Sequence, residues 1–101
     1  MSGDGGEHLY IVTYDIADDR RWRRVFKLMH GYGEWAQLSV FQCRLTRSRY
    51  VELTSRLSAT IAAADDHVLI IDLGIADQVT PHVSSLGKRT FAAVERAPVI
   101  V

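Results

Sequence analysis

The stretch that decides the fold is residues 34–45, EWAQLSVFQCRL. Its apolar residues fall first on even positions and then on odd ones: Ala36, Leu38 and Val40, followed by Phe41, Cys43 and Leu45. Because side chains alternate between the two faces of a strand, one straight strand cannot contain this change of parity. A bulge, a sharp bend or a tight reversal is needed near residues 38–40, so the stretch is predicted to hold two consecutive strands.

The segment before this pair of strands predicts a strand followed by a helix. Residues 9–14, LYIVTY, are rich in β-branched and aromatic side chains, which favour a strand covered on both faces. Asp18 is placed to cap the next helix, and Gly31 and Gly33 are placed to end it. The apolar residues between them recur at helical spacing and predict a core-facing stripe, made of Trp22, Val25, Phe26 and Met29.

The segment after the pair predicts a second helix and a fourth strand. The helix begins near Thr46 or Ser48, and residues 68–73 form an apolar strand after a turn at Asp65 and Asp66. The buried stripe of the helix is predicted to be Tyr50, Leu53, Leu57 and Ile61. The order β-α-β-β-α-β predicts an α+β, ferredoxin-like sandwich.

Length and composition fit a single domain. The chain has 101 residues, of which 48% are hydrophobic and 24% charged, and we expect residues 9–101 to form one domain behind a disordered leader at residues 1–8. One cysteine, Cys43, excludes an internal disulfide and a thiolate zinc site. No apolar stretch is long enough for a membrane span, and no signal peptide precedes the first strand. We therefore expect a soluble, cytoplasmic protein.

The basic residues are concentrated in the middle of the chain. The formal net charge is zero, but residues 20–56 hold nine basic residues and two acidic ones, a net charge of +7. Within the first helix the cations plot opposite the apolar stripe, and four of them are candidate nucleic-acid-binding residues: Arg20, Arg21, Arg24 and Lys27. Arginine matches the geometry of a phosphate, which favours an anionic partner. The alternative is an ordinary solvated basic face.

Asp15 is the candidate metal ligand. It follows the first strand directly, which places a carboxylate at the end of that strand. Mg²⁺ is commonly held by one or two carboxylates together with water and substrate phosphates, so two copies of Asp15 near a two-fold axis could share one ion. The alternative is that Asp15 is a loop aspartate that caps the helix. The histidines are scattered, and neither Ser39 nor Cys43 has the partners of a nucleophile.

The chain ends in an apolar segment that needs a partner. Residues 75–97 carry no clear periodicity, and residues 98–101, PVIV, are strand-like. A terminal strand must pair with the edge of its own sheet or with another subunit. We expect it to pair with a second protomer.

Three motifs together resemble one known family. They are Tyr14-Asp15-Ile16, then Asp18-Asp19-Arg20-Arg21, then Gly33-x-x-x-Gln37-x-Ser39-Val40-Phe41. In this order and spacing they are similar to the signature of the CRISPR-associated protein Cas-two family, the small ferredoxin-like subunit of the spacer-acquisition machinery. The resemblance covers residues 9–73, and the closing apolar residues are similar to the C-terminal pattern of that family.

The resemblance implies a homodimer that exchanges its C-terminal strand. In such a dimer the two Asp15 side chains meet at a divalent metal, expected to be Mg²⁺, and Arg24 holds a phosphate. Positions matching the catalytic motifs of the family are Tyr14, Asp15, Ser39 and Phe41. The implied functions are metal-dependent cleavage of RNA or double-stranded DNA, and a non-catalytic role in bridging two integrase dimers on spacer DNA. The sequence does not decide whether this chain cleaves.

The sequence departs from the family where nuclease activity would be decided. Trp22 and Trp35 stand where basic residues are common in relatives, and Gln42 replaces a frequent acid. We therefore expect weaker binding of phosphate, although Trp22 also fits the core stripe. Two other functions stay open, namely a toxin-like dimeric ribonuclease of the same fold and a non-enzymatic RNA-binding module.

Overall fold

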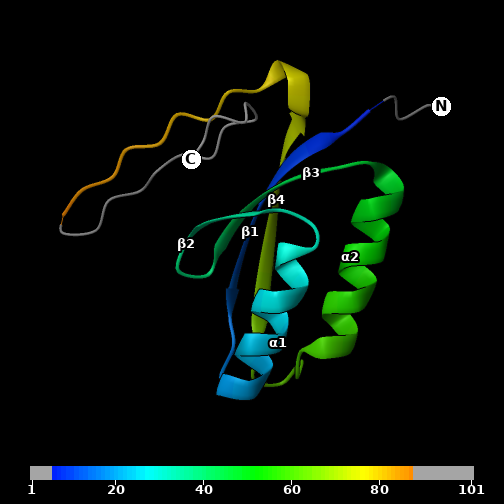
Figure 1. Cartoon of the computed structure of the whole chain (residues 1–101), viewed down its shortest axis with the longest axis vertical. Helices are drawn as coiled ribbons and strands as arrows, with labels where there is room; N and C mark the ends of the chain where they lie inside the picture. The colour runs from blue at the N-terminus through cyan, green and yellow to red at the C-terminus, as the bar shows by residue number, and fades with distance from the viewer. Residues whose placement is uncertain (1–5, 88–101) are drawn as a thin grey trace.

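The computed structural model describes residues 6–87, which form one antiparallel sheet with two helices on one face. The strands lie in the order β2-β3-β1-β4, with bounds β1 His8–Asp15, β2 Glu34–Gln37, β3 Val40–Leu45 and β4 His67–Ile75. The helices are α1 Asp19–His30 and α2 Arg47–Thr60, and both lie in front of the sheet in Figure 1. The predicted β-α-β-β-α-β, ferredoxin-like order is confirmed.

The change of parity is explained by a tight reversal between β2 and β3. Leu38 turns the chain with φ of 43°, a left-handed conformation that is uncommon for a residue with a side chain. The antiparallel register pairs Trp35 with Phe41 and Gln37 with Val40, and it shifts between these two pairs. The prediction of two strands divided near residues 38–40 is confirmed.

The core lies between the sheet and the helices. From the sheet it takes alternate residues of β1 and β3, and from the helices the fully buried Val25, Met29 and Leu53. The core residues of the two strands are Tyr10, Val12, Tyr14, Phe41, Cys43 and Leu45. Trp22 and Phe26 of the predicted stripe are partly buried and pack against this cluster, as do Tyr50 and Ile61. The predicted core faces of both helices are confirmed.

Strand β1 begins earlier than predicted. His8 belongs to β1, where its Nδ1 lies 3.0 Å from Oδ1 of Asp72. The carbonyl of Glu7 accepts a hydrogen bond of 2.8 Å from the backbone N–H of Ala76. The predicted disordered leader is therefore too long at its C-terminal end, because these residues are held by partners about 65 positions away that local composition does not reveal.

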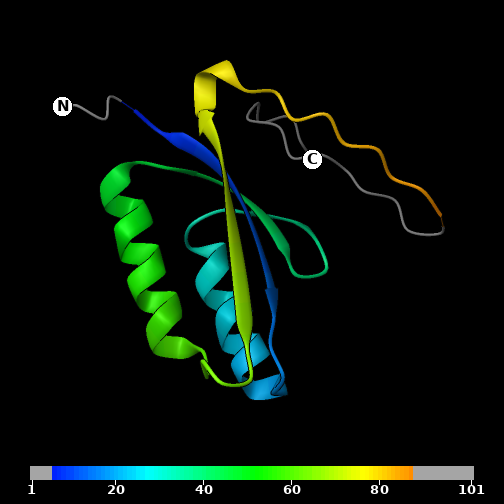
Figure 2. The ribbon, with the colours of Figure 1, turned by 180° about the vertical axis from the view of Figure 1, so that it is seen from behind.

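The chain after β4 makes one short helical turn and then runs without regular structure. The turn is η1, Ala76–Gln78, and residues 79–87 follow it. Seen from behind in Figure 2, the strands carry no helix on this side of the sheet. The predicted terminal strand at residues 98–101 lies outside the described residues. No helix in residues 6–87 is long and apolar enough to cross a membrane.

Candidate nucleic-acid and metal site

Asp15 is the last residue of β1, and its side chain is exposed. It lies opposite His67 of β4 in the antiparallel register. The alternative role of capping α1 belongs to Asp18 instead, whose Oδ2 accepts a hydrogen bond of 2.9 Å from the backbone N–H of Arg21. That bond also lowers the pKa of Asp18 below its usual value. The carboxylate of Asp15 is thus open to solvent and free of any capping role.

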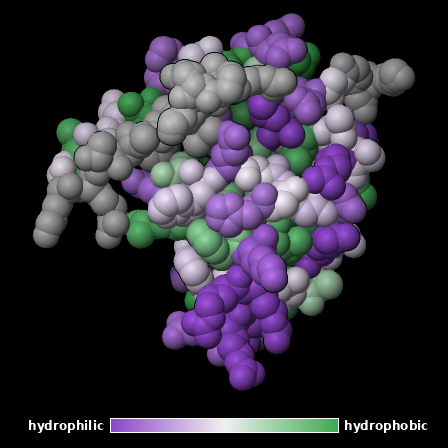
Figure 3. Space-filling model, in the orientation of Figure 1, coloured by the Kyte–Doolittle hydropathy of each residue, from purple (hydrophilic) through white to green (hydrophobic). Residues whose placement is uncertain are grey.

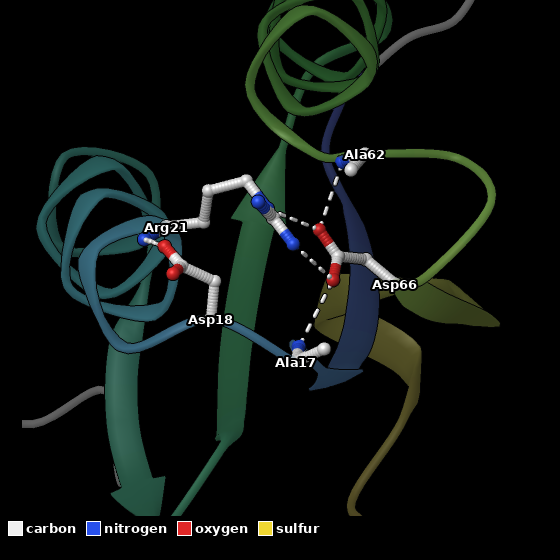
Figure 4. A network of polar contacts seen from close by, with 5 residues as sticks. All are labelled: Ala17, Asp18, Arg21, Ala62 and Asp66. Carbon is white, nitrogen blue, oxygen red and sulfur yellow. Dashed lines mark hydrogen bonds and ion pairs between the residues drawn. The ribbon is translucent and has the colours of Figure 1, made fainter.

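A buried carboxylate that the sequence did not predict fixes the loop behind Asp15. Asp66 has no exposed side-chain surface, and its two oxygens accept from Nε and Nη2 of Arg21 at 2.8 and 3.2 Å. They also accept backbone N–H bonds from Ala17 at 2.9 Å and from Ala62 at 2.8 Å (Figure 4). The hydrogen bond from Arg21, with those from Ala62 and Ala17, lowers the pKa of Asp66 far below its usual range. Asp66 therefore joins the β1–α1 loop to the α2–β4 loop.

Among the predicted phosphate-binding residues, Arg21 has a structural partner. Its guanidinium faces Asp66 from the flank of α1, so it does not share the outward face on which the helical periodicity placed it. Arg20, Arg24 and Lys27 are exposed, and so is Arg23 between them. None of these four cations forms an ion pair with another described residue. Figure 3 shows the resulting hydrophilic surface at the lower end of the molecule, over the start of α1.

Tyr14, Ser39 and Phe41 lie next to one another beside the end of β1. The N–H of Tyr14 donates to the carbonyl of Ser39 at 3.2 Å, and the indole N–H of Trp22 donates to the hydroxyl of Ser39 at 3.1 Å. The rings of Tyr14 and Phe41 stack with centroids 6.3 Å apart. The structure thus brings Ser39 and Phe41 into contact with Tyr14. Asp15, the fourth residue that the sequence analysis grouped as catalytic, is the next residue of β1, and its exposed side chain alternates to the other face of the strand.

The side chains of Tyr14, Ser39 and Phe41 have a structural role at the end of β1. Burial raises the pKa of Tyr14 to about 12, and the adjacent Ser39 hydroxyl offsets only part of that rise. The hydroxyl of Tyr14 is buried and has no well-formed hydrogen bond within residues 6–87. Phe41 is fully buried among Tyr14, Phe26 and His30. Tyr14 is thus a neutral phenol, Ser39 is hydrogen-bonded and Phe41 is a core ring, so these residues support the end of β1. None of the three is a general base at neutral pH.

The thiol and the imidazoles form no second centre in the described part of the chain. Burial raises the pKa of Cys43 to about 12, so the side chain stays a neutral thiol. His8 contacts Asp72, and His30 packs edge-on against Phe26 and Phe41. Among residues 6–87, no group of three or more His, Cys, Asp and Glu side chains could hold a metal ion. A cation at Asp15 would therefore take its remaining ligands from water, from phosphate or from a second chain.

Known proteins match this chain over most of its length. A family model described as CRISPR associated protein Cas2 matches residues 8–79. A Geobacter sulfurreducens protein named CRISPR-associated endoribonuclease Cas2 is 58% identical over 95 residues, which is 94% of this chain and 99% of that protein. A Rhodospirillum rubrum protein named CRISPR-associated endoribonuclease Cas2 1 is 54% identical over 95 residues, or 94% of this chain and 92% of that protein.

Solved structures show the same likeness in three dimensions. The crystal structure of a hypothetical protein from Thermus thermophilus has a TM-score of 0.73 and 33% identity, over 89% of this chain and 100% of that chain. Streptococcus pyogenes Cas2 has a TM-score of 0.68 and 32% identity, over 78% of this chain and 99% of that chain. The family match, the close relatives and the shared fold lead to one conclusion: the chain belongs to the CRISPR-associated protein Cas2 family.

Proposed function

We propose that this protein is a homodimeric CRISPR adaptation subunit that binds nucleic acid through its phosphates and cleaves phosphodiesters at a metal held between two Asp15 carboxylates. One observation carries the proposal: an exposed carboxylate at the end of β1 stands beside a helix whose outer cations have no ion-pair partner in residues 6–87. The bridging of integrase dimers on spacer DNA is part of the proposal and rests on membership of the family.

Phosphate binding is assigned to Arg20, Arg24 and Lys27. Cations without a protein partner lose no ion pair when they neutralise a phosphate, and they release counterions from the nucleic acid. Arg21 is left out of this group, because moving it would leave the buried carboxylate of Asp66 without its partner. Contacts of this kind position a nucleic acid without reading its bases, so we expect little sequence preference.

The metal is proposed to be Mg²⁺ held by Asp15. A hard cation of this kind accepts one or two carboxylates and completes its shell with water and phosphate oxygens. Bound there, it would polarise a phosphate and lower the pKa of a water molecule. The two close relatives are both named endoribonucleases, which favours RNA as the substrate class. Double-stranded DNA is the second substrate to be tested.

The homodimer is supported by a face of the sheet that carries no helix within residues 6–87, although residues 81–86 approach it beside Ile11 and Val40. Ile11 pairs with Ile71 across β1 and β4, on the side opposite the core residue Val12. Leu69 and Ile71 on this side are 46% and 42% exposed. An antiparallel sheet with an apolar outer face is a surface that a second copy can cover. A second copy would also bring the second Asp15 that the proposed metal site needs.

Cleavage assays with Asp15→Asn and Asp19→Asn test the catalytic part. Asp15→Asn keeps the size of the side chain and removes its charge, so it should abolish Mg²⁺-dependent cleavage of RNA or duplex DNA and leave the dimer folded. Asp19→Asn removes the same charge from the first turn of the neighbouring helix and should keep the activity. Persistent cleavage by Asp15→Asn, or by wild type with excess chelator, would show that the centre is wrongly assigned.

Salt titrations and a pull-down test the binding parts. Each phosphate contact contributes a slope of about −0.9 in log affinity against log salt for B-form DNA, so binding should fall steeply with salt. Neutralising Arg20, Arg24 and Lys27 together should flatten that slope and weaken binding to every sequence alike. Asp15→Asn should still pull down the cognate integrase with a short duplex. A flat salt response in wild type contradicts phosphate binding, and loss of the integrase contradicts a bridging role independent of the metal.

A further inference from the structure

The β2–β3 hairpin carries two large exposed side chains that the proposed function does not use. Trp35 is 49% exposed and Leu38 is 52% exposed, although Phe41 of the same hairpin lies in the core. The exposed half of the indole is apolar surface in contact with water, and covering it with a ligand would be favourable. Such a side chain is a candidate for contact with a ligand.

The exposed ring of Trp35 is held in one orientation. Its Nε1 donates a hydrogen bond of 2.7 Å to the carbonyl of Leu38. Its ring meets Phe26 edge-on, with centroids 6.2 Å apart and planes at 80°, and Phe26 in turn stacks on Trp22 at 5.0 Å. A ring fixed before binding loses little conformational entropy when a ligand arrives. Trp35 is therefore a rigid, half-open aromatic surface.

Exposed cations lie on the helix that Trp35 contacts, and the exposed acid beside it in β2 is Glu34. Phe26 joins Trp35 to α1, and Arg23 and Lys27 lie on that helix within one turn of Phe26, exposed and without an ion pair to any residue from 6 to 87. An exposed aromatic face in the edge strand β2 and exposed cations on α1 are thus linked through the contact of Trp35 with Phe26.

We propose that Trp35 is a stacking platform for one unpaired base of a single-stranded nucleic acid, with Arg23 and Lys27 holding the adjoining phosphates. The inference rests on the nucleic-acid binding of the proposed function and adds Trp35 as a residue that contacts a base. The interior bases of a duplex are already stacked on their neighbours, so a blunt duplex has no free base for Trp35. A single strand offers one at every position, and stacking on an aromatic ring tolerates any base.

Binding of a labelled oligouridine, an oligothymidine and a blunt duplex of matched length, measured by anisotropy at fixed salt with chelator present, tests the inference. Trp35→Leu should lower the affinity for both single strands about five-fold or more and change duplex affinity by less than about two-fold. Trp35→Phe keeps an aromatic face and should retain most of the single-strand affinity. Val51→Ala, which trims an equally exposed apolar side chain on α2, should have no effect.

Indole fluorescence gives a second readout in the wild-type protein. Stacking of a base on Trp35 should quench the emission as single strand is added, and the quenching should disappear in Trp35→Phe, in which Trp22 remains partly buried and hydrogen-bonded to Ser39. Unchanged single-strand affinity in Trp35→Leu, with duplex binding intact, overturns this inference and leaves the proposed function standing. Weakened self-association in Trp35→Leu with unchanged affinity overturns it in favour of a contact between copies. Absence of all binding in wild type overturns both.

Discussion

A single buried carboxylate, Asp66, organises the end of the sheet at which Asp15 lies. Its oxygens accept from the side chain of Arg21 at the start of α1, from the backbone N–H of Ala17 just before that helix, and from the backbone N–H of Ala62 in its own loop. Removing one member of a buried, hydrogen-bonded ion pair leaves the other uncompensated, and that is among the most destabilising of changes. The residue is thus structural, although it is charged and sits near a proposed catalytic centre.

We predict that Asp66→Asn lowers the melting temperature by several degrees or more, whereas Asp65→Asn at the exposed neighbouring position changes it little. The folded state lowers the pKa of Asp66, so the stabilisation is fully present above the unfolded value of about 3.9 and is lost as pH falls through the folded value. The difference in melting temperature between wild type and Asp66→Asn should therefore shrink between about pH 4 and pH 2. A difference independent of pH would contradict the assignment.

The sequence predicted the cap at Asp18 but could not predict the partners of Asp66. Asp18 bonds to a residue three positions away, so the signal lies in the local pattern. Asp66 bonds to Arg21 across 45 positions, and in sequence it is one member of an Asp-Asp turn. The same limit explains Arg21, which helical periodicity grouped with the outward cations because periodicity contains no information on the neighbouring loop.

At the scale of the elements, the sequence correctly placed the end of α1 near Gly33, but a glycine is needed there for a different physical reason. It was predicted as part of the helix stop, but its backbone is not in the left-handed region. A Cβ atom at Gly33 would clash with Sγ of Cys43 and would lie 2.7 Å from the carbonyl oxygen of Gln42. Gly33 therefore lets the chain leaving α1 cross closely over β3. At Gly31, the actual C-cap, a Cβ atom would lie 3.3 Å from the carbonyl oxygen of Leu28, a tight contact that a small shift relieves.

We predict that Gly33→Ala lowers the free energy of unfolding by about 2 kcal/mol, whereas Gly31→Ala lowers it by much less. Adding Cys43→Ala to Gly33→Ala should restore only part of the loss, because the carbonyl of Gln42 belongs to the backbone and stays in place. Urea denaturation of the three variants measures these differences. Full recovery in the double variant would show that Sγ is the sole obstacle.

The hairpin was predictable because its evidence is local. The change of parity between Val40 and Phe41 lies within adjacent residues, and each face of a strand is set by alternation alone. The exact turn residue could not be predicted, because Leu38 adopts a positive φ that glycine or asparagine adopts more readily. The hydrogen bond from Trp35 to its carbonyl helps to hold that conformation.

At the scale of the whole molecule, element order predicted the architecture and left one face of the sheet unexplained. Alternation in β1 and β4 places Ile11, Leu69 and Ile71 on the side opposite the helices. From the sequence, residues 9–14 were predicted to form a strand covered on both faces and residues 68–73 an apolar strand. Within residues 6–87 no helix packs there, and the partner we propose is a second copy of the chain.

We predict that Ile71→Asp raises the dissociation constant of the homodimer at least about ten-fold, because a charge would enter an apolar contact. The side chain is 42% exposed in the single chain, so the fold should tolerate the change. Val51→Asp on α2, where the wild-type residue is 53% exposed, is the matched control and should leave the dimer intact. Sedimentation at micromolar concentration distinguishes them. A wild-type protein that stays monomeric with Mg²⁺ would rule out the shared metal site.

The direction of β1 has a practical consequence for anyone who labels or fuses this protein. The strand begins at His8 and ends at Asp15, and its eight residues span roughly 23 Å. A fluorophore or an affinity tag attached ahead of the strand would therefore project from the end of the sheet remote from Asp15 and from the start of α1 (Figure 1). Immobilising the chain from that side should leave its carboxylate and its outer cations facing the solution.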